Sequence, residues 1–534
     1  MIKAIGLTFI LGSLGAAVGE FFGLNLPTLS WGFEMSRSVD WLRWQPAGGG
    51  DVIPWFGWLG TGVAFVFGLW VLIRFSREGA LTPITVRKIE RFKSIKRGYY
   101  SFLLLIGLTG IAALDQVLVG GEALAVRHDG KWSFPAFSRE IEKGGQFGLE
   151  GDAAVSPPDY RELKAAFEKA GDGDRVVLPL WPYSPTGDSI PAVAEPLGTG
   201  DDGVIIAGGK PFKGLGARVF DLRHPEEIHL RYRFRDGLKH GRVDGWDRDR
   251  NRVYEAKYEH GVLVPGSEKW NGAGEPGDFL ALTDGALYQV HFPPAPPTWK
   301  SSPRHPLGTT SQGYDVISYL YGGLKVNFHA ALIYIPLVYA IGVSIGLLMG
   351  FFGGTFDLLV QRIIEILSNI PFLFLVIIVS EAVPATWKDR FGLYVILAIL
   401  AAFGWMGMTY LMRTAALKEK ARDYIAASRV LGASTPRILF KHLLPNSVAI
   451  VVTLIPFSVS GLVLSLTSLD YLGFGLPPKY ATWGKLLRDG LDNLSSPWLV
   501  TSAFLALVVL LILVTFVGEA VREAFDPKKY TYYR

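Results

Sequence analysis

Long runs of apolar residues are the feature that most limits what this chain can fold into. A helix needs about 20 mostly apolar residues to cross the hydrocarbon of a bilayer, because every backbone amide must find its partner within its own segment. The segment from Met1 to Gly23 is either a membrane span or a signal peptide, and the lack of an A-x-A cleavage site favours a span. Seven further segments meet the requirement: Val52 to Ile73, Tyr99 to Leu118, Phe328 to Phe351, Ile363 to Ser380, Phe391 to Met412, Val448 to Leu466 and Leu499 to Val517.

The distribution of Lys and Arg predicts the orientation of these spans. Basic residues concentrate in the cytoplasmic loops of membrane proteins. The loops between Ile73 and Tyr99 and between Met412 and Val448 are both strongly basic, and an even number of predicted spans separates them. Both loops are therefore expected in the cytoplasm. The same side is expected for the basic tail after Val517, which contains Arg522, Lys528, Lys529 and Arg534.

A long polar stretch from Val119 to about Asn327 interrupts the spans and is expected outside the cytoplasm. It is rich in Gly, Pro and charge, and it is too long for a simple connection. Alternating segments such as RVVLPLW and VIIAG predict short strands. FRDGLKHGRVDGW and the following KYEHGVLVPGSEKW resemble two MORN-type hairpin repeats, each with a Gly-centred turn. The sequence therefore predicts a β-rich insert.

Composition excludes several classes of function. The 534 residues include no cysteine, so no disulfide, thiolate metal site or cysteine nucleophile exists. The net charge of +5 is too small to indicate nucleic-acid binding. The nine histidines form no HExxH pattern, and neither a GxxxxGK[ST] loop nor a G-x-S-x-G elbow occurs. We therefore expect no catalytic residue, metal site or cofactor in this chain.

The second basic loop, KEKARDYIAASRVLGASTPRILFKHLLPN, carries the strongest motif. A helical segment with the small residues Ala426, Ala427 and Ser428 is interrupted at Gly432. A short amphipathic segment from Thr435 to Leu443 follows, and Pro445 stands where the next span begins. This predicts a helix, a Gly-hinged turn and a short helix along the membrane, which could pass a partner's motion into the spans. A basic interfacial helix without any coupling role fits the composition equally well.

This loop resembles the EAA loop of binding-protein-dependent ABC permeases, in the version found in the dipeptide and oligopeptide family. Ala426 stands where that family has its glutamate, and Ser428 replaces its second alanine. The residues that match the family pattern are Asp423, Tyr424, Ala427, Gly432, Ala433, Ser434, Arg437, Ile438, His442, Leu444, Pro445 and Asn446.

Three further stretches carry the same resemblance in the expected order. HPLGTTSQGYDVISYLYGG is similar to the segment before the permease core, although Thr310, Tyr314 and Tyr319 replace charged residues of the family. GEAVREAFDP resembles the cytoplasmic tail. The long segment ahead of HPLGT is similar to the branch that contains the microcin C uptake permease. DYLGFGLPPKYATWGKLLRDG resembles the extracytoplasmic loop between the last two spans, with matches at Gly473, Gly475, Pro477, Pro478, Trp483 and Gly484.

The resemblance implies a fold, a function and a set of partners. The fold is an all-α membrane bundle, the type I permease core of an ABC importer, with the β-rich insert. The function is ATP-driven import of peptides or peptide-like solutes across the bacterial inner membrane. The partners are a second homologous permease, two ATP-binding subunits that hold ATP and magnesium, an extracytoplasmic solute-binding protein and lipid, but no nucleic acid. The expected regions are 1–98 (extra membrane region with a basic loop), 99–118 (first core span), 119–327 (insert), 328–517 (permease core) and 518–534 (cytoplasmic tail).

Some residues and functions keep two interpretations. Arg362 and Glu365 lie three residues apart on one helical face and form either a gate between helices or a local ion pair. His329 and the Asn369–Pro371 kink either line the solute path or serve helix packing. A membrane-anchored receptor that acts through the insert is the alternative function. An intramembrane enzyme would need ionisable pairs at mid-span, and the spans have almost none.

Overall fold

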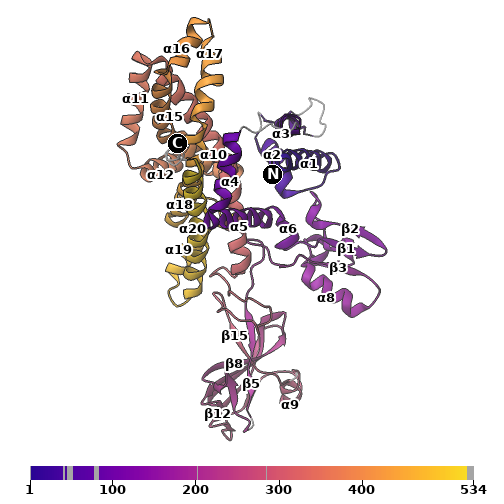
Figure 1. Cartoon of the computed structure of the whole chain (residues 1–534). Helices are drawn as coiled ribbons and strands as arrows, with labels where there is room; N and C mark the ends of the chain where they lie inside the picture. The colour runs from indigo at the N-terminus through magenta and orange to yellow at the C-terminus, as the bar shows by residue number, and fades with distance from the viewer. Residues whose placement is uncertain are drawn as a thin grey trace. The chain divides into compact units, whose positions relative to one another are not determined.

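The computed structural model describes residues 2–39, 42–44, 52–76, 83–200, 202–283 and 285–525 (Figure 1). The tail residues Lys528, Lys529 and Arg534 lie outside the described residues. Contacts divide the chain into two compact units. The first unit combines Met1–Pro182, Tyr321–Lys485 and Leu505–Arg534, and the second combines Tyr183–Leu320 and Leu486–Phe504.

Five helices of the described chain are long and apolar enough to cross a membrane. They confirm five predicted spans, because each apolar run satisfies its backbone internally. A sixth crossing is possible where α11 (Gly354–Ser368) and α12 (Phe372–Ala382) meet at an 86° bend. Pro371 lies at this bend and has no N–H to continue the helix. The five are α3 (Trp55–Ser76), α10 (Val316–Phe352), α14 with α15 (Leu393–Gly404 and Met406–Lys420), α17 to α18 (Thr435–Leu472) and α20 (Pro497–Phe525).

The predicted span from Tyr99 to Leu118 differs from the structure. Its helix α5 (Lys96–Ala113) is only 18 residues long. The charged residues Lys96 and Arg97 form its first turn, so the apolar part is shorter still. Asp115 has a φ of 22°, which ends α5 and starts the single turn α6 (Asp115–Leu118). Because of its basic first turn, α5 is not among the five long apolar helices. In helix α1 (Ile2–Phe21) the apolar stretch that the structure describes in full is Gly6–Phe21, so the membrane crossing of this helix also stays a prediction.

The N-terminal helices pack closely within the first unit. Gly6 of α1 and Gly68 of α3 face one another, and a Cβ on Gly68 would lie 2.8 Å from the Gly6 carbonyl oxygen. Helix α2 (Pro27–Ser38) reaches the core bundle, since Arg390 donates from Nε to the Ser38 carbonyl oxygen at 2.8 Å. Arg390 belongs to α13 (Ala385–Phe391), which precedes α14. The extra helices are thus attached to the helix bundle, as is α4 (Pro83–Ser94), whose Arg91 pairs with Glu523 at 3.8 Å.

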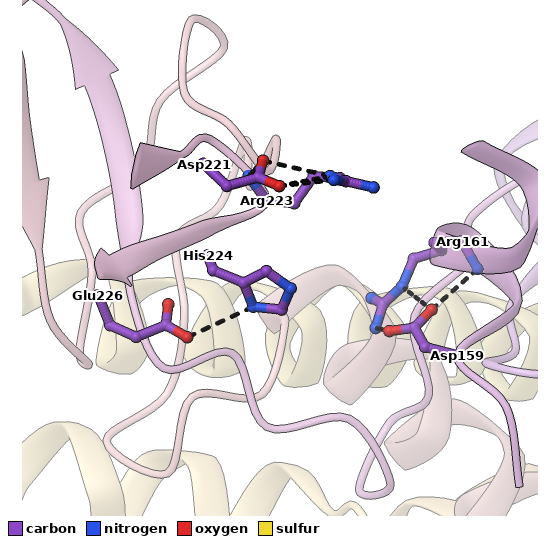
Figure 2. A network of polar contacts seen from close by, with 6 residues as sticks. All are labelled: Asp159, Arg161, Asp221, Arg223, His224 and Glu226. Carbon is purple, nitrogen blue, oxygen red and sulfur yellow. Dashed lines mark hydrogen bonds and ion pairs between the residues drawn. The ribbon is translucent and has the colours of Figure 1, made fainter. Parts of the chain in front are cut away.

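The first unit also contains a small β region. Strands β1 (Ala125–His128), β2 (Lys131–Ser133) and β3 (Arg175–Val177) form an antiparallel sheet in the order β2-β1-β3. Helix α8 (Tyr160–Ala170) buries Leu163 in the same core as Val126 of β1. Asp159 caps α8 by accepting from the Arg161 backbone N–H at 2.8 Å (Figure 2). Although burial raises the pKa of Asp159, the bonds and charge of Arg161 hold it below its usual value.

The second unit is built on a nine-stranded antiparallel sheet. Its main order is β13-β12-β11-β9-β8-β15-β4, with β10 on β9 and β14 on β12. At the β8–β9 turn, Arg223 pairs with Asp221 and lowers the pKa of that carboxyl (Figure 2). The main strands are β4 (Val193–Pro196), β8 (Gly214–Asp221), β9 (His224–Arg235), β11 (Gly241–Trp246), β12 (Arg252–Glu259) and β15 (Tyr288–His291).

The two predicted hairpin repeats are visible in this sheet. Asp236 and Gly237 have φ values of 53° and 75°, and His260 and Gly261 have 48° and 86°. Both pairs lie in two-residue turns with left-handed backbone, which glycine favours. Each turn leads into a short strand, β10 (Leu238–Lys239) or β13 (Val262–Leu263). The β-rich insert is therefore confirmed, and it includes β14 (Lys269–Trp270) and a small sheet of β5 (Gly198–Thr199), β6 (Ile205–Ala207) and β7 (Lys210–Pro211).

The residues of the predicted insert, 119–327, divide between the two units. Residues up to Pro182 cluster with the first unit, and the second unit begins at Tyr183. A parallel β-bridge pairs Trp181 with Val119, directly after α6, and so helps to keep the residues up to Pro182 in the first unit. The fold is thus a membrane helix bundle with two β regions between its core helices.

Candidate functional site

The loop between α15 and α18 has the hinged backbone predicted from its sequence. Helix α16 (Asp423–Val430) is followed by a turn at Gly432, whose φ of 77° is left-handed. The Gly432 N–H donates to the Arg429 carbonyl at 2.9 Å, and the Ala433 N–H donates to the Ser428 carbonyl at 3.0 Å. These bonds close the helix end in the manner that favours glycine.

The second half of this loop corrects the prediction. A separate short helix along the membrane was expected from Thr435 to Leu443. Instead α17 (Thr435–Ile438), a π-helical turn over Leu439–Leu443 and α18 (Leu444–Leu472) continue as one helix. The wide π turn accommodates Pro445, which cannot donate a backbone hydrogen bond. The turn at Gly432 is therefore joined directly to a membrane-spanning helix.

A polar network ties down the base of the loop. The Tyr424 hydroxyl donates to Glu419 Oε2 at 2.6 Å and accepts from Asn446 Nδ2 at 2.8 Å. Glu419 also accepts from Arg422 Nε at 3.0 Å. Burial and the bond to Glu419 raise the pKa of Tyr424. This network joins the end of α15, the start of α16 and the start of α18, and Ile425 is buried beside it.

The tip of the loop is apolar and open to solvent. Val430 is 88% exposed, Leu431 is 86% exposed and Phe440 is 69% exposed. A group of exposed large apolar side chains on a rigid base is typical of a protein contact. Of the predicted coupling residues, Asp423, Ala426, Ala427, Gly432, Ser434, Arg437 and Pro445 are exposed, whereas Tyr424, Ser428, Ala433 and His442 are half-buried.

The two predicted gate residues form a local pair. Arg362 donates from Nη1 to Glu365 Oε2 at 2.6 Å within α11, and the Arg362 side chain is 75% exposed. A different ion pair joins two helices. Arg413 of α15 donates to both carboxylate oxygens of Asp357 in α11 at 2.5 and 2.6 Å, and the Asp357 side chain is only 10% exposed. The structure therefore identifies Asp357 and Arg413 as an ion pair that joins α11 to α15.

A cavity of about 470 Å³ lies at the bend between α11 and α12. Ile370 and Pro371 of the predicted kink line it, and His329 is not among its lining residues. The lining has no charged side chain and combines apolar groups with hydroxyls and small residues. The polar and small members are Tyr334, Ser368, Gly404, Gly407, Ser458, Gly461 and Ser465.

The predicted loop after α18 is closed on itself. Asp470 is buried and accepts from the Leu476 N–H at 2.7 Å. Lys485 donates to the carbonyl oxygens of Pro477 at 2.6 Å and Tyr480 at 2.9 Å. Pro477 is half-buried and Pro478 is exposed.

Close packing involves two of the predicted positions in the same loop, which continues into α19 (Trp483–Asp492). Trp483 is 4% exposed, and its ring fills the space where Gly323 would carry a Cβ. A Cβ on Gly484 would meet Thr467 and Asp470 of α18. Trp483 and Gly484 therefore pack closely against α10 and α18.

Comparisons with known proteins agree with these features. The family described as "Binding-protein-dependent transport system inner membrane component" matches residues 342–530. The peptidoglycan transport system permease protein YejE of Agrobacterium fabrum is 40% identical over 223 residues, which are 42% of this chain and 57% of that protein. The inner membrane ABC transporter permease protein YejE of Escherichia coli is 29% identical over 452 residues, or 84% of this chain and 98% of that protein.

A further relative and one solved structure are also similar to this chain. The dipeptide transport system permease protein DppC of Haemophilus influenzae is 31% identical over 236 residues, or 44% of this chain and 78% of that protein. A solved structure of the MetNI methionine ABC transporter is 20% identical with a TM-score of 0.34, and it covers 39% of this chain and 96% of that one. The apolar helices, the matched family region and the relatives together lead to one conclusion: this chain belongs to the binding-protein-dependent inner-membrane permeases of ABC transporters, in the group that includes the YejE, DppC and OppC permeases.

Proposed function

We propose that this chain is the transmembrane permease subunit of an ATP-driven importer for peptides or peptide-like solutes. The loop from Asp423 to Pro445 is its coupling element. Two ATP-binding subunits dock on this loop and hold the ATP and magnesium. A second homologous permease completes the membrane path, and an extracytoplasmic solute-binding protein delivers the solute. The chain sits in the bacterial inner membrane among lipid, with its C-terminus in the cytoplasm, and holds no cofactor.

The observation that carries this proposal is the contrast between the tip and the base of the loop. Val430 and Leu431 are almost fully exposed, so a docking subunit can bury their apolar side chains. The Glu419–Tyr424–Asn446 network holds the base, so a push on the tip reaches two helices instead of being lost in a flexible loop. Because α17 runs on into α18, a movement at Gly432 becomes a movement of a membrane span.

The lining of the cavity at the α11–α12 bend suits the uncharged, polar backbone of a peptide solute. Its lining offers the Tyr334, Ser458 and Ser465 hydroxyls among apolar groups and no charge. Such a surface distinguishes solutes by size and hydrogen bonding but not by the charge of their side chains. Recognition of particular peptides is therefore assigned to the binding protein, and alternating access requires only that the path opens on one side at a time.

Substitution of Gly432 tests the coupling role. Gly432→Pro is incompatible with a φ of 77° and also removes the N–H that bonds Arg429. We expect it to abolish uptake of a labelled peptide in cells, with membrane insertion unchanged by protease-accessibility mapping. Gly432→Asn is the control, because Asn tolerates left-handed backbone, and it should retain most uptake. Normal uptake by Gly432→Pro would contradict the proposal.

The division of labour has its own test. The purified chain should show no ATPase activity, and activity should appear only when the ATP-binding subunits are added. Robust hydrolysis by the chain alone would overturn the assignment of ATP chemistry to partners. A passive membrane anchor, the alternative function, needs no hinged loop, so it predicts normal function for every Gly432 variant.

A further inference from the structure

The β-rich unit contains a second cavity, of about 620 Å³. It lies between the turn that joins β11 to β12 and the segment that leads from β14 through α9 (Pro276–Leu280). Val253 and Phe279 are buried and form its floor, and Trp270 forms part of its wall. Its volume falls within the range of about 300–1,000 Å³ that is usual for small-molecule sites.

The charges around this cavity are unbalanced. Asp247, Glu275 and Asp278 line it with carboxylates, and Arg252 is the one cation in the lining that the structure describes. The Arg252 guanidinium is already engaged, since its Nη2 lies 2.8 Å from Asp244 and 2.7 Å from Glu255. Neither of these acids belongs to the lining. The cavity therefore presents negative charge that its own cation does not neutralise.

Two of the carboxylates are available to a ligand. Within the described part of the chain, no hydrogen bond or ion pair is found for the side chains of Glu275 and Asp278. Asp247 is held in place by Asn251, whose N–H donates to Oδ1 at 2.8 Å and whose Nδ2 donates to Oδ2 at 3.3 Å. One carboxylate is thus fixed at the rim, and two have their acceptor capacity free.

The aromatic wall is also held in a fixed orientation. Trp270 donates from Nε1 to the Gly274 carbonyl at 3.0 Å, and its ring centroid lies 5.0 Å from that of Phe279. Backbone at Gly272 packs against the indole so closely that a Cβ there would collide with it. The π face of an indole attracts a cation, and the negative charge of the neighbouring carboxylates adds to this attraction.

We propose that this cavity binds a short peptide through a free ammonium group. Carboxylates supply charge-assisted hydrogen bonds to an ammonium, and the apolar floor receives the carbon chain beside it. An anion would be repelled by the lining. A neutral sugar would leave the carboxylates without a counterion. The choice of a peptide rests on the proposed function, whereas the preference for a cation rests on the cavity alone.

Calorimetric titration of the purified full-length chain with a set of related probes tests this proposal. The probes are alanyl-lysine amide, its Nα-acetyl form, its Nε-acetyl form and its doubly acetylated form. We expect the unmodified probe to bind, and we expect the doubly acetylated form to bind at least about tenfold more weakly, because a charge-assisted hydrogen bond is lost. The two singly acetylated probes show whether the cavity selects a peptide N-terminus or a lysine-type side chain.

Matched variants locate the binding. Asp278→Asn and Glu275→Gln keep the side-chain shape and should each weaken the unmodified probe several-fold, whereas Glu227→Gln, at an exposed acid outside the cavity, should leave binding unchanged. Equal affinity for all four probes would overturn the proposal. Binding of a chitin disaccharide with no effect of the Asp278 and Glu275 substitutions would also overturn it. Because binding is read without transport, failure here is separate from failure of Gly432→Pro to block uptake.

Discussion

Removing the Arg413 side chain tests whether the pair with Asp357 holds α11 against α15. Arg413→Met keeps most of the aliphatic stem but leaves the Asp357 carboxylate, 10% exposed, without its two donors at 2.5 and 2.6 Å. Breaking a buried ion pair at one partner costs about 3–5 kcal/mol. Because Arg413 is 23% exposed and water can reach it, we expect Arg413→Met to lower the free energy of unfolding by about 2–3 kcal/mol.

Arg362→Met, in α11, is the matched control. Its partner Glu365 lies three residues away, and the Arg362 side chain is 75% exposed. An exposed pair of this kind contributes about 0.5 kcal/mol or less. Unfolding of the purified chain in mixed micelles by increasing SDS measures the loss of stability for Arg413→Met and for Arg362→Met. Adding Asp357→Asn and the double variant Asp357→Asn/Arg413→Met gives the coupling energy between Asp357 and Arg413. Equal losses for Arg413→Met and Arg362→Met would refute the inter-helix role of the first pair.

Three other outcomes follow from features of the two units. Gly484→Ala should lower stability by about 1–3 kcal/mol in the same assay, since its Cβ would meet α18, whereas Gly107→Ala, in open space, should not. Burial, with the charge of Arg218, lowers the pKa of His229 from 6.5 to about 4, so the unfolded chain binds its proton first as the pH falls. Hydrogen-exchange protection of β8 and β9 should therefore fall by up to about 3 kcal/mol between pH 6.5 and 4, and His229→Phe should flatten this dependence. Tyr424→Phe removes one hydrogen bond from Glu419 and one from Asn446 and should cost about 1–3 kcal/mol; an unchanged unfolding midpoint would contradict the network at the loop base.

Local patterns carried the predictions that the structure confirms. A long apolar run can satisfy its backbone hydrogen bonds in a bilayer by forming a helix, and five predicted spans correspond to long helices. The pairs Asp236–Gly237 and His260–Gly261 have left-handed backbone. Glycine in the second position of each pair favours this backbone, so both hairpins were predictable. The turn at Gly432 was predictable for the same reason.

Long-range contacts explain what the sequence could not predict. Asp357 and Arg413 are 56 residues apart, and nothing in a charge pattern tells which of several basic residues will reach a given acid. Proximity along the chain favoured Arg362 with Glu365 instead. No local pattern marks Glu419 as part of the coupling loop, because the turn between α15 and α16 is what brings it to Tyr424. The bend at Pro371 lies inside a run that reads as one apolar span.

The 86° bend between α11 and α12 has a consequence for the membrane itself. At a helix break, backbone N–H and C=O groups lose their partners in the preceding turn, and hydrocarbon cannot replace them. The cavity beside Ile370 and Pro371 gives these groups access to water. We therefore expect water inside the bundle at this bend, so that a solute that enters need not shed its entire hydration shell to pass.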